Sequence, residues 1–550
     1  MMDLIDDATT MTSPDDILKR LETLNAIGVA LSSERDLGSL LERILEAARG
    51  FANADGGTLY RVDHEKLFFE VLRNDTLGLR MGGKTGKPID FAPLPMHRED
   101  GSPNDTLVVA HAALTAQTVN IPDAYTAQGF DFSGTRAFDA KTGYRSQSFL
   151  TVPMKDHSGA VIGVLQLINA KAADGTVCAF SAADQQLVES LASQAAIALN
   201  NRKLIEQLEG LFEALISLIN TAIDEKSPYT AGHCSRVPVL TMMLAEAASH
   251  STAGPLADFR MTEADRYELK IAGLLHDCGK ITTPVHVVDK ATKLEMIFDR
   301  IELIDTRIEV LLRDAEIARL KGELSTEEHA QRVQQLLADR ERVRASNIGG
   351  EYMDDTAVKA IVDLGRRSWR TQEGQERTLL DAGEIENLTI RRGTLTNTER
   401  DIINRHINVT IDMLEALPWP GHLLRVPEYA GGHHERMDGK GYPRGLTRDQ
   451  MSVPARVMGI ADIFEALTAR DRPYKPAKTL SESLSILGRM KLDGHVDPDL
   501  FDVFVRDRVF MEYAKRFLDA DKIDRIDWSK MPGISPEIAA RMIEAEASSG

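Results

Sequence analysis

The chain has 550 residues, of which 43% are hydrophobic and 27% are charged, and its formal net charge is −19. This length predicts several domains, because one globular domain takes roughly 100–200 residues. The acidic balance argues against nonspecific binding to DNA or to membrane surfaces, which needs a basic surface. No apolar run is long enough to span a bilayer, and the first residues lack the basic and apolar regions of a signal peptide. We therefore expect a cytoplasmic protein with no DNA or membrane partner.

The first part of the chain shows the pattern of a mixed α+β domain. Residues 1–15 are polar and acidic and are expected to form a disordered tail, and a helical pattern follows up to residue 52. Strand-like runs occupy residues 56–62, 66–72 and 148–171, the last as two strands joined by an Asp-His-Ser-Gly turn. A helix begins near Ser181, a good N-cap residue. Strands flanked by helices predict an α+β domain over residues 16–200.

The helix after Ser181 continues beyond that domain with a narrow apolar seam. The seam positions alternate in spacings of four and three: Ile197, Asn201, Leu204, Leu208, Leu211, Leu215 and Leu218. This spacing is typical of a coiled coil, although a helix packed on its own domain would also use an apolar stripe. An Asn in such a seam favours a parallel dimer in one register. We expect a connecting coiled-coil helix over residues 190–222 and a parallel homodimer.

The second half of the chain is helical in pattern. Two charged amphipathic helices are expected at residues 293–320 and 326–345, with Ser325 and Glu328 forming a capping box at the start of the second. Residues 346–394 are irregular and polar in pattern, and helices resume at Thr396. The pattern predicts an all-α domain over residues 205–530.

Seven residues of metal-ligand type are scattered through this half. They are His233, His276, Asp277, His406, His433, His434 and Asp462. Each alone is more simply explained as a core or helix-end residue. Together they supply five imidazoles and two carboxylates, which is enough for two metal ions a bridging distance apart. Such a binuclear centre is typical of hydrolases, most often of phosphate esters.

The sequence around these residues resembles a known family. The motifs AGHCSRV, HDCGK, HHERMDGKGYPRGL and ADIFEALTARDRPYK are similar to those of the HD-GYP family, bacterial phosphodiesterases of cyclic di-GMP with an HD-type metal-hydrolase fold. The resemblance implies two divalent ions, iron or manganese. One ion would be held by His233, His276, Asp277 and Asp462, and the other by His406, His433 and His434, with Asp277 bridging.

The same resemblance implies roles for residues around the metals. Asp277 and Lys280 would be catalytic, with Lys280 contacting a phosphate at the scissile bond. The substrate-binding residues would be Gly441, Tyr442, Pro443, Arg472, Tyr474 and Lys475. Hydrolysis would give pGpG and, after a second cut, GMP. Tyr229 stands where some members have a Glu for a third metal, so two ions are expected.

The family's compact domain does not need the residues between Asp277 and His406. Residues 293–394 therefore look like a helical insertion in the HD-type domain. The insertion either decorates the surface as a hairpin or acts as a lid or dimer contact.

The N-terminal domain resembles a GAF domain. The motifs FDAKTGYRSQSFLTVPM, GAVIGVLQLINAK and FSAADQQLVESLASQAAIAL carry the similarity. Its resemblance is to GAF domains that bind cyclic nucleotides, whose marker set is matched here by Asn169, Lys171, Phe180 and Asp184. Gln185 departs from that set, because Glu is expected there. The domain would bind a cyclic nucleotide or another small ligand, or serve in dimerisation.

Together these observations predict a multidomain protein that hydrolyses cyclic di-GMP under the control of a GAF sensor. Three alternatives stay open: a noncatalytic cyclic di-GMP receptor, a phosphodiesterase of another cyclic dinucleotide such as cyclic GMP-AMP, and an HD hydrolase acting on nucleotides.

Overall fold

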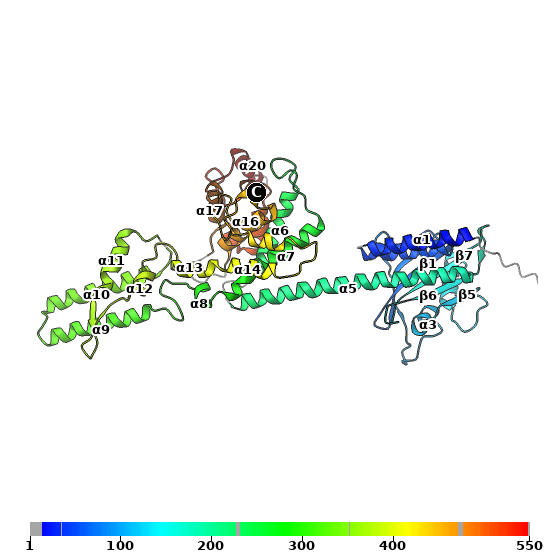
Figure 1. Ribbon diagram of the computed structural model, residues 1–550, viewed down its shortest axis with the longest axis horizontal. Coiled ribbons are helices and arrows are strands. Elements are labelled where there is room, and N and C mark those ends of the chain that lie inside the picture. The colour runs from blue at the N-terminus through cyan, green and yellow to red at the C-terminus, as the bar shows by residue number, and fades with distance from the viewer. Residues whose placement is uncertain (1–13, 35, 227–231, 351, 471–476, 548–550) are drawn as a thin grey trace, which may run out of the picture. The chain divides into compact units, whose positions relative to one another are not determined.

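The structure is a computed structural model that describes residues 14–34, 36–226, 232–350, 352–470 and 477–547 (Figure 1). The chain divides into two compact units, the first ending at Phe212 and the second beginning at Glu213. Among the helices of the described ranges, none combines the length and apolar character needed to cross a bilayer.

The first unit is built on one antiparallel sheet. Its strands are β1 (Ala54–Asp63), β2 (Lys66–Asn74), β3 (Leu79–Gly82), β4 (Leu94–Pro95), β5 (Val119–Ile121), β6 (Phe149–Lys155), β7 (Val161–Lys171) and β8 (Val177–Cys178). The strand order is β3-β2-β1-β7-β6-β5, with β4 beside β2 and β8 beside β7. β1 and β7 are long and largely buried, as central strands covered on both faces should be.

Helices cover both faces of this sheet. They are α1 (Pro14–Ser33), α2 (Leu37–Phe51), α3 (Val108–Thr115), α4 (Ser133–Thr142) and α5 (Ala182–Lys226). Side chains of α1, α2 and the first turns of α5 share one apolar core with the sheet, including Leu45, Leu165 and Val188. α3 packs on the other face, around Tyr60 and Val164 (Figure 1). These layers confirm the predicted N-terminal α+β domain.

α5 is a single helix of 45 residues. Ser181 precedes its first turn, where its hydroxyl bonds to Asp184 and accepts from the Asp184 backbone N–H, as expected for an N-cap. The predicted seam beyond the sheet is exposed: the exposed fractions are 67% for Leu208, 68% for Leu211 and 64% for Leu218. This part of α5 therefore presents an exposed apolar stripe.

The described part of the second unit is mainly helical, which confirms the predicted class of the C-terminal domain. Its main elements are α6 (His233–Ser249), α7 (Glu263–Leu275), η1 (Cys278–Thr282), α8 (Val285–Val288), α13 (Asn397–Asn404), α14 (His406–Glu415), α15 (Val426–Gly431), η2 (Arg448–Gln450), α16 (Val453–Thr468), α17 (Leu480–Leu492), α18 (Pro498–Arg506), α19 (Val509–Phe517), η3 (Ala520–Lys522) and α20 (Pro536–Ala547). α16 packs on α6, α15 on α7 and α14 on η1. These three contacts bring the ligand-bearing segments together.

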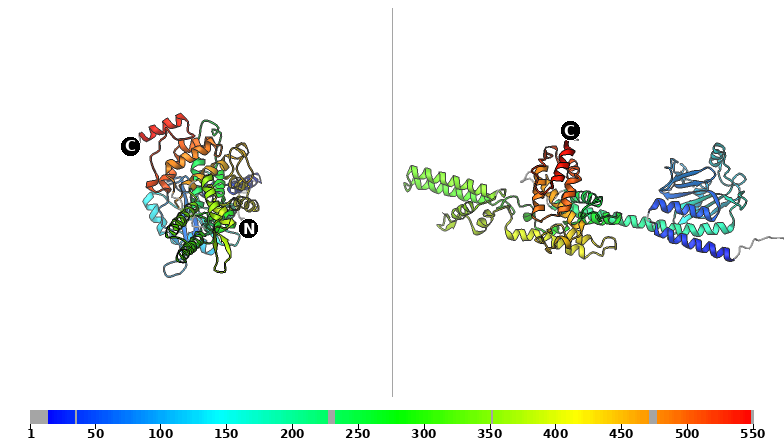
Figure 2. Two further views of the ribbon diagram at one scale, coloured as in Figure 1. Left: turned by 90° about the vertical axis from the view of Figure 1, so that its left-hand side faces the viewer. Right: turned by 90° about the horizontal axis from the view of Figure 1, so that it is seen from above.

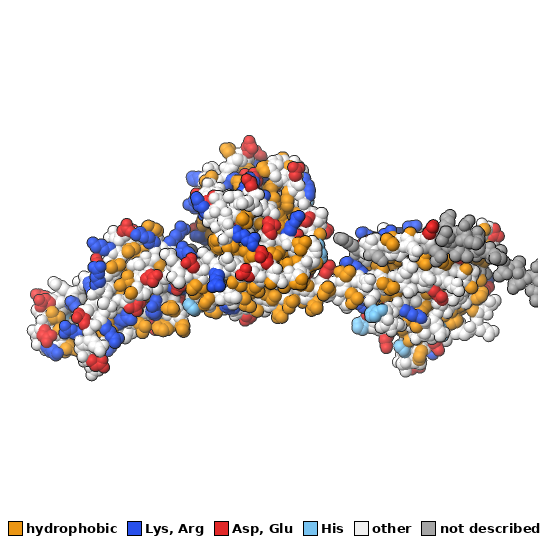
Figure 3. Space-filling model, in the orientation of Figure 1, with side chains coloured by type: hydrophobic (Ala, Val, Ile, Leu, Met, Phe, Trp, Pro, Cys, Tyr) orange, Lys and Arg blue, Asp and Glu red, His pale blue; other side chains and the backbone are white. Residues whose placement is uncertain are grey.

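Residues 293–394 form a substructure with a hydrophobic core of its own. Its elements are α9 (Ile301–Leu320), α10 (Thr326–Asn347), α11 (Asp355–Gly365), β9 (Ser368–Arg370), β10 (Glu376–Thr378) and α12 (Ala382–Leu388). α9 and α10 lie side by side as a hairpin (Figure 2). Ile308 and Leu336 lie in the core, whereas acidic and basic side chains are interspersed over the outer surface (Figure 3).

Two expectations for this substructure need correction. The first helix begins at Ile301 rather than 293, because residues 293–300 form turns. Residues 346–394 are not irregular, since they contain α11, α12 and the β9–β10 pair, so the insertion is not wholly helical. These elements are too short for a periodic pattern, and Asp354 and Asp381 cap the helices. The predicted capping box of Ser325 and Glu328 is confirmed.

Candidate metal centre

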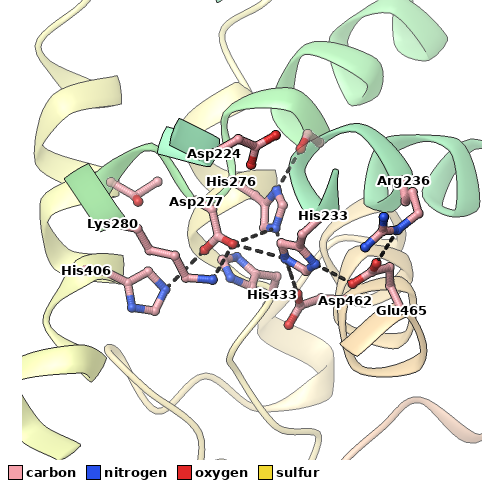
Figure 4. Close-up of polar contacts among 12 residues, drawn as sticks. Asp224, His233, Arg236, His276, Asp277, Lys280, His406, His433, Asp462 and Glu465 are labelled. Atoms are coloured by element: carbon pink, nitrogen blue, oxygen red, sulfur yellow. Dashed lines mark hydrogen bonds and ion pairs between the residues drawn. The ribbon is translucent and has the colours of Figure 1, made fainter. Parts of the chain in front are cut away.

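The seven predicted ligand residues come from five separate segments that meet in one place, and six of them are labelled in Figure 4. His233 is the first residue of α6, and His406 is the first residue of α14. His276 and Asp277 follow the last turn of α7, the pair His433 and His434 follows α15, and Asp462 lies within α16. Helix ends suit this purpose, because a side chain there points off the helix into the space between neighbours.

The side chains form two groups that share Asp277. Its Oδ2 atom lies 3.1 Å from His233 Nε2 and 3.3 Å from His276 Nε2. Its Oδ1 atom faces the other way, 3.3 Å from His406 Nε2. Asp462 Oδ1 closes the first group, 3.3 Å from His233 Nε2. Asp277 therefore lies between the two groups with one oxygen toward each.

The second group consists of three imidazoles. His406, His433 and His434 each present a ring nitrogen to a common point, within 4.8 Å of one another. His434 Nε2 lies 3.2 Å from His406 Nε2. Two neutral imidazole nitrogens with lone pairs gain nothing from such an approach unless a proton or a cation lies between them.

Hydrogen bonds behind the site fix the tautomers of three histidines. The Nδ1 atoms of His276, His406 and His433 lie 2.7, 2.5 and 2.6 Å from the backbone carbonyl oxygens of Gly273, Ile403 and Ala430. A carbonyl can only accept, so Nδ1 carries the proton and donates, and Nε2 keeps a lone pair directed into the centre. Metal-ligating histidines are commonly held in this way.

Four buried atoms at the centre have no hydrogen-bond partner among the residues that the structure describes. They are Nε2 of His233, His276 and His433, and Oδ1 of Asp277. Leaving a buried polar atom unpaired is costly. The donor set of imidazole nitrogens and carboxylate oxygens suits divalent metal ions. The residues present therefore fit a pair of such ions.

Charge coupling within the centre shows in the pKa values. Burial alone would raise the pKa of Asp277, but Lys280 and the neighbouring histidines lower it well below its ordinary value. Burial alone would lower the pKa of His233, but Asp277, Asp462 and Glu465 raise it. Burial beside His276 lowers the pKa of His433 to about 4, so that ring is neutral at physiological pH. His433 and Asp277 therefore have the neutral ring and the ionised carboxylate that bind metals, whereas His233 without a metal is held as a cation by the carboxylates around it.

Lys280 lies at the open side of this centre. Its ammonium is 2.5 Å from Asp277 Oδ2, and its side chain is 20% exposed. The turn that carries it packs tightly on α14, because a Cβ on Gly279 would lie 2.1 Å from the His406 carbonyl oxygen. Gly279 N–H also donates to Thr410 Oγ1 at 2.9 Å. This close approach holds the turn that carries Lys280 against α14, which carries His406.

The predicted substrate loop borders the second group of ligands. The Tyr442 ring stacks on His434 with centroids 4.8 Å apart, and Pro443 follows it through a cis peptide bond. A Cβ on Gly441 would lie 2.4 Å from the backbone nitrogen of Arg436, so the loop turns back tightly on itself. The predicted contacts Arg472, Tyr474 and Lys475 lie outside the described residues, and so does Tyr229.

Sequence reasoning missed two residues behind His233. Glu465 is buried, and its carboxylate contacts His233 Nδ1 and accepts a 2.6 Å hydrogen bond from Arg236 Nε. A carboxylate behind a ligating imidazole orients the ring and raises its basicity. The available signal was spacing: Glu465 lies one turn after Asp462, on the same face of α16.

The first unit contains a cavity of about 330 Å³ on one face of its sheet. Aromatic side chains provide much of its lining, among them Tyr60, Phe69, Phe132 and Phe149. Arg73 supplies a positive charge to the described lining, but its guanidinium is already bonded to Glu42 and to the carbonyls of Leu72 and Met81.

The four predicted GAF marker residues do not line this cavity. Asn169 accepts from the backbone of Gln147 and donates to Tyr144 and Arg145. Lys171 pairs with buried Asp55, and Phe180 lies in the core. These contacts, together with the Asp184 cap, hold the domain's own strands and loops in place.

Separate parts of the chain match known domain families, a GAF domain in the first unit and HD domains in the second. The GAF domain family matches residues 36–199, and two HD domain families match residues 230–372 and 353–500.

Several curated proteins are similar to parts of this chain. A 3'3'-cGAMP-specific phosphodiesterase 1 of Vibrio cholerae is 38% identical over 129 residues, covering 23% of this chain and 29% of that protein. A 3'3'-cGAMP-specific phosphodiesterase 3 of the same organism is 25% identical over 293 residues, covering 53% and 38%. A cyclic di-GMP phosphodiesterase of Pseudomonas aeruginosa is 36% identical over 164 residues, covering 28% and 38%. The matched segments thus span less than two fifths of each relative.

Proposed function

We propose that the protein is a metal-dependent phosphodiesterase that hydrolyses a cyclic dinucleotide. The observation that carries this proposal is the set of four buried ligand atoms without hydrogen-bond partners, which converge from helices far apart in sequence. A noncatalytic receptor would not need an ionised, bridging Asp277 and a lysine beside it.

In this proposal the two groups of side chains each hold one divalent ion. His233, His276 and Asp462 would hold the first, His406, His433 and His434 would hold the second, and Asp277, which lies between the two groups, would serve both. Iron and manganese both accept such mixed nitrogen and oxygen ligands. When bound, the pair supplies a nucleophilic hydroxide at neutral pH and Lewis-acid stabilisation of a phosphoryl group. Lys280 adds a positive charge that stabilises negative charge on phosphoryl oxygens in the transition state.

Cyclic di-GMP is the proposed substrate, and pGpG is the first product. Two observations support this substrate. The predicted substrate loop of Gly441, Tyr442 and Pro443 lies beside the second group of ligands, and cyclic dinucleotide phosphodiesterases are among the relatives. Cyclic GMP-AMP is the second candidate, because relatives specific for it match the chain as well.

One experiment tests this function. The full chain is purified without oxygen, its metal content is measured, and products are separated after incubation with cyclic di-GMP and cyclic GMP-AMP. We expect about two ions per chain and faster formation of pGpG than of products from cyclic GMP-AMP. Faster hydrolysis of cyclic GMP-AMP would make it the proposed substrate in place of cyclic di-GMP. If protein with its metal fully bound hydrolysed neither dinucleotide, the proposed activity would be overturned.

We also propose that the GAF cavity takes a small ligand that regulates hydrolysis. Its volume and aromatic lining suit a planar molecule. The Arg73 guanidinium is occupied by protein acceptors, which makes a free phosphate a poor fit and favours a weakly charged ligand over a cyclic nucleotide. Calorimetric titration of the full chain with cAMP and cGMP tests this. Saturable binding of either one would favour a cyclic nucleotide over a weakly charged ligand.

The exposed seam of α5 supports a parallel homodimer. A stripe of leucines at heptad spacing is stable in water when a second copy covers it. The double substitution L208E/L215E should therefore give monomers in analytical ultracentrifugation, whereas S217E, on a position away from the seam, should leave a dimer. A dimer that persists in L208E/L215E would show that another surface joins the copies.

A further inference from the structure

The last turn of α5 contacts the two segments that present His233 and Lys280. We infer that Lys226 and Asp224 in this turn are positioning residues for hydrolysis, which act by holding the main chain on both sides of the centre. This inference rests on the proposed hydrolysis at the metal centre. It adds two residues that are not among the proposed metal ligands.

Lys226 holds the turn that carries Lys280. Its ammonium donates to the backbone carbonyl oxygen of Lys280 at 3.1 Å and to that of Ile281. Carbonyls are good partners for a partly buried ammonium, and hydrogen bonds with a charged donor are stronger than neutral ones. The pair of bonds fixes the backbone of Lys280, whose side chain reaches back to Asp277. Without Lys226 the protein would still have the Lys280 ammonium, but the backbone that carries Lys280 would no longer be fixed by these hydrogen bonds.

Asp224 holds the other segment. Its Oδ2 atom accepts a 3.1 Å hydrogen bond from the backbone N–H of Gly232, the residue directly before His233. Gly232 has a φ of 78°, so the chain enters α6 through a left-handed residue that needs a fixed backbone. In the close-up, Asp224 lies behind the centre, on the side of His233 and His276 (Figure 4).

These two contacts give α5 a direct mechanical role. The first turns of α5 contribute Val188 and Leu191 to the core of the GAF domain, and its last turn ends on the catalytic segments. A small displacement of the last turn would move the backbone of Lys280 and of His233 together. A second contact of α5 involves side chains alone: Glu213 binds Lys270 of α7 at 3.2 Å through exposed side chains, and Lys270 lies six residues before His276.

The test compares K226M, K226R and D224A with K270M as the matched control, all in the full chain loaded with metal. Two substrates are used: cyclic di-GMP, and bis(4-nitrophenyl) phosphate, which reports hydrolysis at the centre whatever the natural substrate. We expect K226M and D224A to lower kcat on both substrates by about 10–100-fold, as supporting residues around metal sites do. K226R should recover most of the loss, because it keeps the donors, and K270M should match the wild type.

The readouts separate positioning from other roles. Metal content in K226M should equal that of the wild type, since no ligand is changed. Unchanged kcat in a folded K226M, or a rise in KM alone, would overturn the inference, the latter by showing that Lys226 binds substrate. If K226M does not fold, D224A decides by the same criteria. Wild-type turnover of bis(4-nitrophenyl) phosphate but not of cyclic di-GMP would refute the proposed substrate and leave this test intact.

Discussion

The metal centre and the GAF cavity present opposite kinds of evidence for a ligand. At the metal centre, buried nitrogen and oxygen atoms face one another without hydrogen bonds. In the GAF domain, the polar groups of buried Asn169 and Arg73 and of half-buried Lys171 are bonded to the protein itself. The first pattern specifies the chemistry of the missing partner, whereas the second leaves only the volume and apolar character of the space.

This difference has a physical cause. A metal ion replaces hydrogen bonds with coordination, so its ligands stay unpaired in the protein alone, and the donor atoms identify the ion's class. An apolar cavity binds through dispersion and exclusion of water, which depend little on the identity of the ligand. The same sequence therefore predicts the ligand of one site closely and of the other only by size.

The largest expected effect comes from removing ligands at the metal centre. The variant H276A/D277A should lose its bound metal and reduce turnover to background, because Asp277 lies between the two groups of candidate ligands and presents one oxygen to each. Metal analysis and product chromatography measure the two losses together. H286A, at an exposed histidine of α8, is the control and should keep both properties. Full turnover by metal-free H276A/D277A protein would refute the metal assignment.

A smaller loss of metal affinity or turnover is expected when Glu465, which contacts the proposed ligand His233, is changed. In E465Q the side chain keeps one acceptor oxygen but cannot serve both His233 and Arg236 as an anion. Metal affinity or turnover should fall by about 10–100-fold, as measured for other residues that orient a ligating histidine. Metal titration followed by an activity assay measures this. E327Q, at an exposed position of α10, should behave as the wild type, and an E465Q protein equal to it would remove Glu465 from the site.

The sequence was sufficient to predict which side chains converge at the candidate metal centre, because these residue types are chemically unusual together. Five histidines in motifs such as HDCGK and HHERMDGKGYP identified the residues before any contact was known. Glu465 was missed, because a glutamate on a helix is common and only the packing of α16 on α6 places it behind His233.

In the insertion, residues 293–394, the sequence did not predict the short elements. The apolar periodicity of the sequence predicts the insertion's two long helices. The other elements are short: α11 has 11 residues, α12 has 7, and β9 and β10 have 3 each. Elements of that length are decided by capping and by a shared core rather than by local pattern. In the GAF domain, the marker residues could be named from the sequence, but their contacts within the fold could not, because partners such as Lys171 and Asp55 are remote in sequence.

In the GAF domain, loss of a buried charge should cost stability rather than function at the metal centre. Burial alone would raise the pKa of Asp55, but Lys171, Tyr144 and Thr76 outweigh it and lower the pKa. The carboxylate therefore stabilises the fold above its unfolded pKa of about 4, and this contribution is lost as pH falls through the lower folded value. At pH 7, D55N should destabilise the domain by about 1–3 kcal/mol.

Hydrogen exchange in β1 and β7 of the full chain measures this change in the first unit alone. The difference between D55N and wild type should shrink as the pH falls from about 4 toward the lower folded pKa, because the wild-type carboxylate is then protonated in the unfolded chain before it is protonated in the folded domain. Metal content should not change. A difference that persists unchanged into acid would show that shape rather than charge at residue 55 stabilises the domain.

The smallest expected effect tests whether the departure at Gln185 matters for a ligand. Gln185 accepts from Asn120 at 3.1 Å and donates to Glu189 at 3.0 Å, so both ends of its amide are used within the protein. Q185E would restore the family's residue but lose the donor and place two carboxylates one helical turn apart. We expect a destabilisation of about 0.5–1.5 kcal/mol. Because Gln185 does not line the cavity, ligand affinity should be unchanged. Tight cyclic-nucleotide binding gained by Q185E in calorimetry would show that the marker set acts on the cavity after all.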